Sequence, residues 1–245
     1  MILFGKINMK TWLKISVSIW LTGVIIAGIA FPMVRVPETW WQFPLIPGLE
    51  EKARNIIFHV PISWATVVAF IMAMVNGILY LSKKDIDYDL RSVSSAGLGM
   101  LLCVLATVTG AIWAKFSWGS FWNWDPRQTS IFILLLIYGA YFVLRSAIDE
   151  EERRATLSSV YSIIAGVTVP FFIFVMPRIM SGLHPGSLGD EQGKGPVVEF
   201  KMATNMLMVF FASLIGFTVL YFWMYSLKIR TMRIERQIQQ QTEIN

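Results

Sequence analysis

Long apolar runs without charges constrain this chain more than any other feature. Of its 245 residues, 55% are hydrophobic and only 15% are charged, whereas an ordinary soluble domain has ~25% charged residues. The apolar residues collect in runs close to the ~20 residues that a helix needs to cross the hydrocarbon region of a bilayer. The sequence therefore predicts an all-α integral membrane protein, a bundle of six transmembrane helices.

Hydropathy places the six spans and indicates a single transmembrane domain over residues 1–245. The first run follows Lys6, Lys10 and Lys14 and resembles a signal peptide, but its apolar stretch is longer than the core of such a peptide, so we interpret it as a span. There is no internal repeat and no soluble domain, and residues 228–245 form a tail. The predicted spans are residues 12–31, 61–81, 92–113, 129–144, 157–176 and 202–227.

The distribution of Lys and Arg predicts the orientation of these spans. Thirteen of the 21 basic residues lie on one side, in the N-terminal segment, the two turns near 83–91 and 145–154, and the tail. Basic residues favour the cytoplasmic side, so both termini are expected in the cytoplasm. The remaining segments, 32–60, 114–128 and 177–201, then lie on the outer side. They are longer than the cytoplasmic turns or chemically unlike them, so we expect the functional chemistry there.

The charges and the single cysteine exclude several other classes. The formal net charge of +5 comes from residues that lie between apolar runs and do not form a basic stripe. This distribution argues against a nucleic-acid partner, and we expect membrane lipid to surround the chain. Cys103 stands alone in an apolar run, which excludes an intrachain disulfide and a C-x-x-C-H site for covalent heme. The segment GDEQGKG at 189–195 lacks the spacing of a phosphate loop and has no Ser or Thr after Lys194.

The outer segment between the third and fourth spans is rich in tryptophan and reads WGSFWNWDPRQTS over residues 118–130. One interpretation is an aromatic belt, because Trp accumulates at membrane interfaces. A belt, however, requires neither a glycine between bulky rings nor the turn at Asp125 and Pro126, which is suited to capping a helix that begins near Thr129. The other interpretation is an apolar platform for a flat macrocycle, since indoles offer large rigid stacking area. The residues assigned to it are Trp118, Gly119, Trp122, Trp124, Asp125 and Arg127.

The sequence contains only two histidines, His59 and His184, and the predicted topology puts both on the outer side. A lone histidine at an interface is more often an ordinary polar residue than a ligand. Two of them beside the tryptophan-rich segment favour a shared ligand, because imidazoles from two sides hold heme iron while apolar groups surround the ring. We therefore predict a heme site at the outer ends of the helices.

The motif WGxxWxWDxR at 118–127 resembles the signature of the heme-handling protein family, and within it the CcmC family of cytochrome c maturation proteins. The resemblance covers nearly the whole chain. It implies that His59 and His184 are the axial ligands of the heme iron and that residues 118–125 form the platform. It also implies that heme b is a non-covalent, transient cargo, held on the periplasmic side of the bacterial inner membrane.

The same resemblance implies a set of partners. Members of this family work with an ABC-type pair, CcmA and CcmB, and with the small protein CcmD, and they present heme to the chaperone CcmE for the biogenesis of c-type cytochromes. The absence of an ATP-binding motif here fits that division of labour. The chain is therefore expected to bind and deliver heme and not to be an enzyme.

Pro126 and Gln128 depart from this branch and are similar to the synthetase-type relatives CcsA and CcmF. The alternative hypothesis is thus a component of a cytochrome c heme lyase. Those relatives are longer and carry additional histidines inside their spans, whereas none of the spans predicted here contains one. A b-type electron carrier or quinone oxidoreductase would likewise require histidines near the middle of the membrane.

Overall fold

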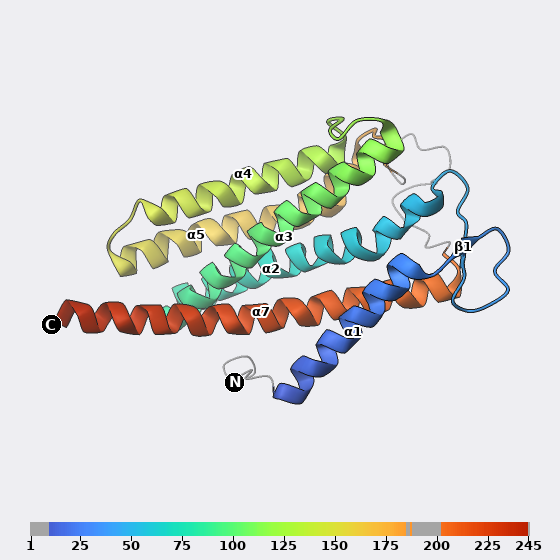
Figure 1. Cartoon of the computed structure of the whole chain (residues 1–245). Coiled ribbons are helices and arrows are strands. Elements are labelled where there is room, and N and C mark those ends of the chain that lie inside the picture. Colours follow the sequence, from blue (N-terminus) through green and yellow to red (C-terminus); the bar gives the residue numbers. More distant parts are fainter. Residues whose placement is uncertain (1–9, 185–186, 188–201, 245) are drawn as a thin grey trace.

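The computed structural model describes residues 10–184, 187 and 202–244. Within that part of the chain, six helical segments are long and apolar enough to cross a membrane, which confirms the predicted all-α, six-span architecture. Figure 1 shows an elongated helical bundle, with the N-terminal helix inclined to the long C-terminal one. The helices are α1 (Thr11–Ala30), α2 (Ile56–Lys83), α3 (Ile86–Trp118), α4 (Pro126–Ser146), α5 (Glu151–Pro170) with its extensions η2 (Phe171–Val175) and α6 (Met176–Ile179), and α7 (Thr204–Ile244).

Two helices reach further at one end of the bundle than hydropathy predicts. Helix α2 begins at Ile56 and includes Pro61, and α3 continues to Trp118. His59 and Trp118 therefore lie on helices and not in loops. Helix α3 ends at Gly119, which has a φ of 83° that favours glycine. We call this end of the bundle the histidine end.

Aspartates cap two of the helices. At the start of α3, Asp85 accepts a hydrogen bond from the N–H of Asp87 at 2.9 Å, and at the start of α4, Asp125 accepts one from the N–H of Arg127 at 2.9 Å. Pro126 occupies the first turn of α4, where its missing N–H removes no intrahelical bond. The predicted cap is confirmed, and the helix begins at Pro126 itself.

Helix α2 is central and packs against α3, α5 and α7. It approaches α5 closely, since a Cβ on Gly77 would lie 2.5 Å from Ser162 Oγ. Small residues at such crossings let helix backbones approach, which drives association where lipid provides no hydrophobic force between helices. In the core between α2 and α4, the rings of Phe70 and Tyr138 stack with centroids 3.5 Å apart.

Helix α1 is peripheral. It contacts mainly α7, and Trp20 Nε1 donates a hydrogen bond to the carbonyl oxygen of Ala212 on that helix at 2.9 Å. Figure 1 shows α1 crossing α7 and diverging from the bundle toward its own N-terminus. The segment after α1 forms two short parallel strands, β1 (Met33–Val34) and β2 (Phe43–Pro44), and a 3-10 helix, η1 (Glu50–Asn55).

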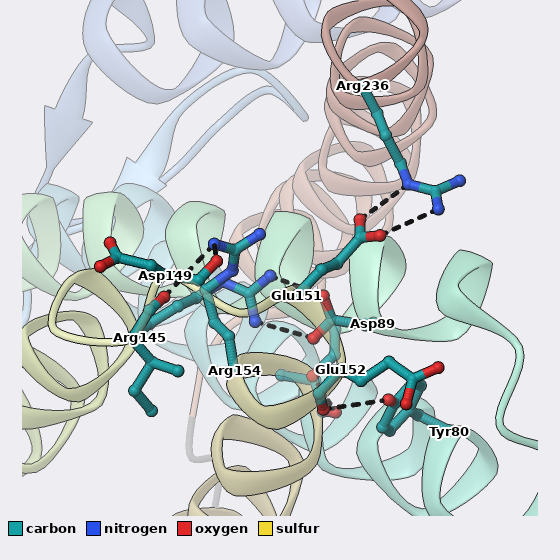
Figure 2. A network of polar contacts seen from close by, with 11 residues as sticks. Tyr80, Asp89, Arg145, Asp149, Glu151, Glu152, Arg154 and Arg236 are labelled. Atoms are coloured by element: carbon teal, nitrogen blue, oxygen red, sulfur yellow. Dashed lines mark hydrogen bonds and ion pairs between the residues drawn. The ribbon is translucent and has the colours of Figure 1, made fainter. Parts of the chain in front are cut away.

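Ion pairs tie the helices together at the other end. Arg145 of α4 donates two hydrogen bonds, of 2.7 and 2.5 Å, to the buried carboxylate of Asp89 on α3. Arg236 of α7 donates two, of 2.8 and 3.0 Å, to Glu151 at the start of α5. Figure 2 shows both pairs. The predicted tail is thus a continuation of α7, and its first turns are fastened to the bundle.

Candidate functional site

The last three turns of α3 form the wall on which the site is built. Thr109 and Trp113 are four residues apart, so they lie on one face of the helix, about 6 Å apart along its axis. Thr109 contacts His59 from α2, and Trp113 contacts His184 from the segment after α6. The structure therefore brings both predicted histidines to the same helix. They also lie within electrostatic range of each other and of Arg127.

The ring of His59 is held by α3 on one side. Its Nδ1 lies 2.9 Å from Thr109 Oγ1, and a Cβ added to the adjacent Gly110 would lie only 2.9 Å from His59 Cε1. The Thr109 hydroxyl has one proton, which it donates within its own helix to the carbonyl oxygens of Leu105 and Ala106, at 2.9 and 3.1 Å. The oxygen consequently accepts a hydrogen bond from His59 Nδ1–H. This tautomer leaves the lone pair of Nε2 available for a ligand.

The ring of His184 is held by a carboxylate and two indoles. Its Nδ1 lies 3.0 Å from Asp125 Oδ1. Its centroid is 5.4 Å from the ring of Trp113 and 4.7 Å from that of Trp118, which meets it edge to face. The carboxylate accepts the Nδ1–H, so Nε2 is again the nitrogen with a lone pair to offer.

Asp125 organises this half of the site. Its side chain is fully buried, and besides His184 it accepts hydrogen bonds from the N–H groups of Arg127 and Leu183, at 2.9 and 2.7 Å. Burial raises the pKa of Asp125, but the hydrogen bond of His184, the charge that His184 carries when it is protonated in acid, and the two backbone N–H groups outweigh burial and lower the pKa to about 2. Asp125 is therefore ionised at neutral pH.

Burial has the opposite consequence for the imidazole. It lowers the pKa of His184, and although the hydrogen bond to Asp125 raises this pKa, that contribution does not outweigh burial. His184 is thus neutral at neutral pH, which is the state that binds a metal. Gly182 permits the arrangement, because a Cβ there would lie 2.8 Å from Asp125 Oδ2.

The remaining tryptophans of the motif form a second aromatic group. Trp122 and Trp124 meet edge to face at 5.7 Å, and both contact Phe132 of α4. Gln128 shapes this loop, since its Oε1 accepts from the N–H of Asn123 at 2.8 Å and its Nε2 donates to the carbonyl oxygen of Phe121 at 3.1 Å. The expected single platform is therefore divided into two aromatic groups, and of the predicted rings only Trp118 contacts a histidine in the described part of the chain.

Arg127 is a half-buried residue at the start of α4. Its Nε is buried and has no hydrogen-bond partner among the described residues. Arg178, from α6, is close enough for the two positive charges to interact. A buried donor without an acceptor is costly, and two neighbouring guanidinium groups match carboxylates. The site therefore offers a place for an anionic group next to the two imidazoles.

The structure adds residues that the sequence did not single out. Thr109, Gly110 and Trp113 lie inside a hydrophobic run, where nothing distinguishes them from ordinary packing residues. Gly182 lies two residues before His184, and this proximity was the only feature of the sequence that could have indicated a role for Gly182 in the site. Gln128 was noted for its departure from the family motif and not for its role in the loop. Gly119, which sequence analysis noted only as a glycine between bulky rings, ends the helix that carries Trp118.

Fold and site together define a class of protein. It is a multi-pass, all-α membrane protein that presents two imidazole rings, indole rings and two neighbouring guanidinium groups at one end of its bundle. The chain belongs to the CcmC family, because the profile of that family, described as heme exporter protein C, matches residues 4–244.

Individual relatives agree with this assignment. Heme exporter protein C of Rhodobacter capsulatus is 28% identical over 202 residues, which are 81% of each chain. The protein of the same name from Paracoccus denitrificans is 28% identical over 179 residues, or 73% of this chain and 72% of the relative. That of Escherichia coli is 27% identical over 164 residues, or 64% of this chain and 65% of the relative.

Proposed function

We propose that this protein binds heme b non-covalently at the histidine end, with His59 and His184 as the two axial ligands of the iron. One observation carries the proposal. Each histidine uses Nδ1 to bond a protein group, on Thr109 or Asp125, and leaves Nε2 with a lone pair and no partner among the described residues. Histidines that ligate metals are held in this way, because the second ring nitrogen fixes tautomer and orientation.

The surroundings of the histidines suit a porphyrin. Trp113 and Trp118 provide apolar faces and edges for the macrocycle. Arg127 and Arg178 supply charges for its two propionates, and the Nε of Arg127 is buried without an acceptor among the described residues. In the second aromatic group, Trp124 exposes its ring beside Trp122 and offers a further apolar face. The relatives are named heme exporter protein C, which agrees with heme as the ligand.

The role that follows is delivery of heme for the biogenesis of c-type cytochromes. We infer that heme is a transient cargo, presented to the chaperone CcmE, and that the chain works in a complex with CcmA, CcmB and CcmD. The charge distribution supports an orientation with both termini in the cytoplasm and the histidine end on the periplasmic side of the bacterial inner membrane. The residues assigned to the site hold and orient a ligand, which supports a binding protein and not an enzyme.

The absorption spectrum of the purified protein with added heme tests the site. We expect a six-coordinate, low-spin heme, and we expect His59→Ala together with His184→Ala to abolish that spectrum. Trp118→Ala should weaken binding, whereas Trp40→Ala, which removes an exposed indole at the same end of the bundle, should not. A double histidine variant with an unchanged six-coordinate spectrum would contradict the proposal.

A second measurement tests delivery. With CcmE present, heme should move from this protein to the chaperone. Covalent attachment of heme to an apocytochrome by this protein in a host without other maturation proteins would instead support the heme lyase alternative, which the Trp-Asp-Pro sequence at 124–126 keeps open.

A further inference from the structure

The two histidines differ in the group that accepts the hydrogen bond from Nδ1. His184 donates to the carboxylate of Asp125, and His59 donates to the neutral hydroxyl of Thr109. From this difference, and resting on the proposed heme site, we infer that the two axial ligands are unequal: His184 is the anchoring ligand, and His59 is the exchangeable ligand that leaves the iron first when heme is handed over.

The electronic argument begins at Asp125. A carboxylate that accepts the Nδ1–H of an imidazole draws the proton toward itself and makes Nε2 a stronger electron donor. This carboxylate is fixed in place, because it also accepts hydrogen bonds from the N–H groups of Arg127 and Leu183. His184 therefore forms the stronger bond to iron.

Thr109 has no comparable influence on His59. Its oxygen is neutral, and its proton is donated to the carbonyl oxygens of its own helix. It accepts the Nδ1–H of His59 and so fixes the tautomer, but a neutral acceptor polarises the ring far less than an anion does. Thr109 is thus a positioning residue for the weaker ligand.

Steric enclosure acts in the same direction. A histidine in a loop would ordinarily be the more easily displaced of the two. Here the described residues 183 and 184 are pinned, because Leu183 and His184 both bond Asp125, and the indoles of Trp113 and Trp118 pack against the His184 ring. On the α3 side, the described contacts of His59 are with Thr109, the backbone of Ala106 and the bare backbone at Gly110. Asp125 and the two indoles therefore hold the His184 ring in place and oppose its departure from the iron.

The exchange itself is a simple substitution. The bond between iron and His59 Nε2 breaks, and an incoming donor atom supplies a new electron pair to the same position. The iron keeps its oxidation state. No proton has to move, because Nε2 already carries its lone pair in the tautomer that Thr109 selects. An incoming ligand from a receiving protein can therefore replace His59 while His184 retains the heme.

Carbon monoxide is a suitable probe, since it binds ferrous heme and displaces one axial ligand. Resonance Raman and infrared spectra of the resulting adduct report on the histidine that remains opposite to it. We expect the adduct of the wild-type protein to match that of His59→Gly, in which only His184 is left, and to differ from that of His184→Gly. We expect Asp125→Asn to shift the spectra of the wild-type and His59→Gly adducts alike.

Exchange rates provide a second readout. Thr109→Val should accelerate displacement by carbon monoxide about 10-fold, in line with the 10- to 100-fold effects of groups that orient metal ligands, and Thr109→Ser should restore the wild-type rate. Thr107→Val is the matched control, because Thr107 makes the same type of bond within α3, to the carbonyl oxygen of Cys103 at 2.8 Å, and its loss should leave the rate unchanged.

The outcomes separate this inference from the proposed function. If the wild-type adduct matches His184→Gly, or if Asp125→Asn leaves the His59→Gly adduct unchanged, the assigned order of the ligands is wrong although the heme site stands. If the single variants keep the six-coordinate spectrum of the wild-type protein, the histidines are not the ligands, and the proposed function fails with the inference.

Discussion

His184 Nδ1 lies 3.0 Å from Asp125 Oδ1, although 59 residues separate the two in the sequence. The same carboxylate caps α4 and bonds the N–H of Leu183, so one buried anion connects a helix start, a loop and an imidazole. If His184 binds iron, Asp125 controls how strongly it does so.

Asp125→Asn tests this control without removing the cap. Asn caps helices about as well as Asp, so α4 should keep its first turn while His184 loses its anionic partner. We expect heme affinity to fall about 10- to 100-fold, measured by titration of the purified protein with heme. Asp85→Asn is the control, because Asp85 caps α3 in the same way at the opposite end of the bundle. Equal losses in both variants would mean that the effect is general destabilisation.

Gly110→Ala tests the contact between His59 and α3. A Cβ at this position would lie 2.9 Å from His59 Cε1, so the ring must move and its bond to Thr109 should be lost. We expect heme binding to weaken about 10-fold or more. Gly97→Ala, on the same helix, meets nothing closer than 3.8 Å and should bind heme normally, with helix stability unchanged or raised by up to about 1 kcal/mol. Normal heme binding by Gly110→Ala would show that the His59 ring is not constrained there.

The stability of the histidine end should decline on acidification. Burial lowers the pKa of His184 below its ordinary 6.5, so the unfolded chain binds a proton more readily than the folded one, and stability falls as pH drops below about 6.5. The lowered pKa of Asp125, about 2, adds stability that is complete above its ordinary value of 3.8 and is lost as pH falls toward about 2.

Thermal unfolding in detergent measures this dependence. We expect Tm to fall between about pH 7 and about pH 5 and again below about pH 4. His184→Gln cannot take up the first proton, so its Tm should fall less over the upper range. An identical decline in the variant would assign that range to other groups.

The ion pairs at the opposite end should contribute unequally to stability. Arg145→Ala leaves the carboxylate of Asp89, which is 2% exposed, without its bidentate partner, and removal of one member of a buried pair costs about 3 to 5 kcal/mol. Arg236→Ala removes a pair in which both side chains are about a third exposed, which costs about 0 to 1 kcal/mol. Denaturant unfolding in mixed micelles would compare the two, and a larger loss for Arg236→Ala would overturn the ranking.

Local features of the sequence were sufficient to predict the all-α, six-span architecture. The length of each apolar run is a property of consecutive residues, and it predicted all six spans. Asp125 followed by Pro126 predicted a helix start for the same reason, since a cap involves only neighbouring residues. The distribution of Lys and Arg then predicted that His59, His184 and the tryptophan-rich segment share one side of the membrane.

Only the tertiary structure decided which groups meet. Nothing in the sequence around Thr109 indicates a function. Thr109 contacts His59 because α2 and α3 pack against each other at this level of the bundle. Trp118 and Trp124 belong to one motif, but they lie in different aromatic groups because α3 ends at Gly119, between them. Hydrophobicity and capping act over a few residues, so the chain alone determines spans and helix ends. The hydrogen-bond partner of a ring nitrogen depends on how helices and loops that are distant in sequence pack together. This packing brought the Asp125 carboxylate to Nδ1 of His184 and the neutral hydroxyl of Thr109 to Nδ1 of His59.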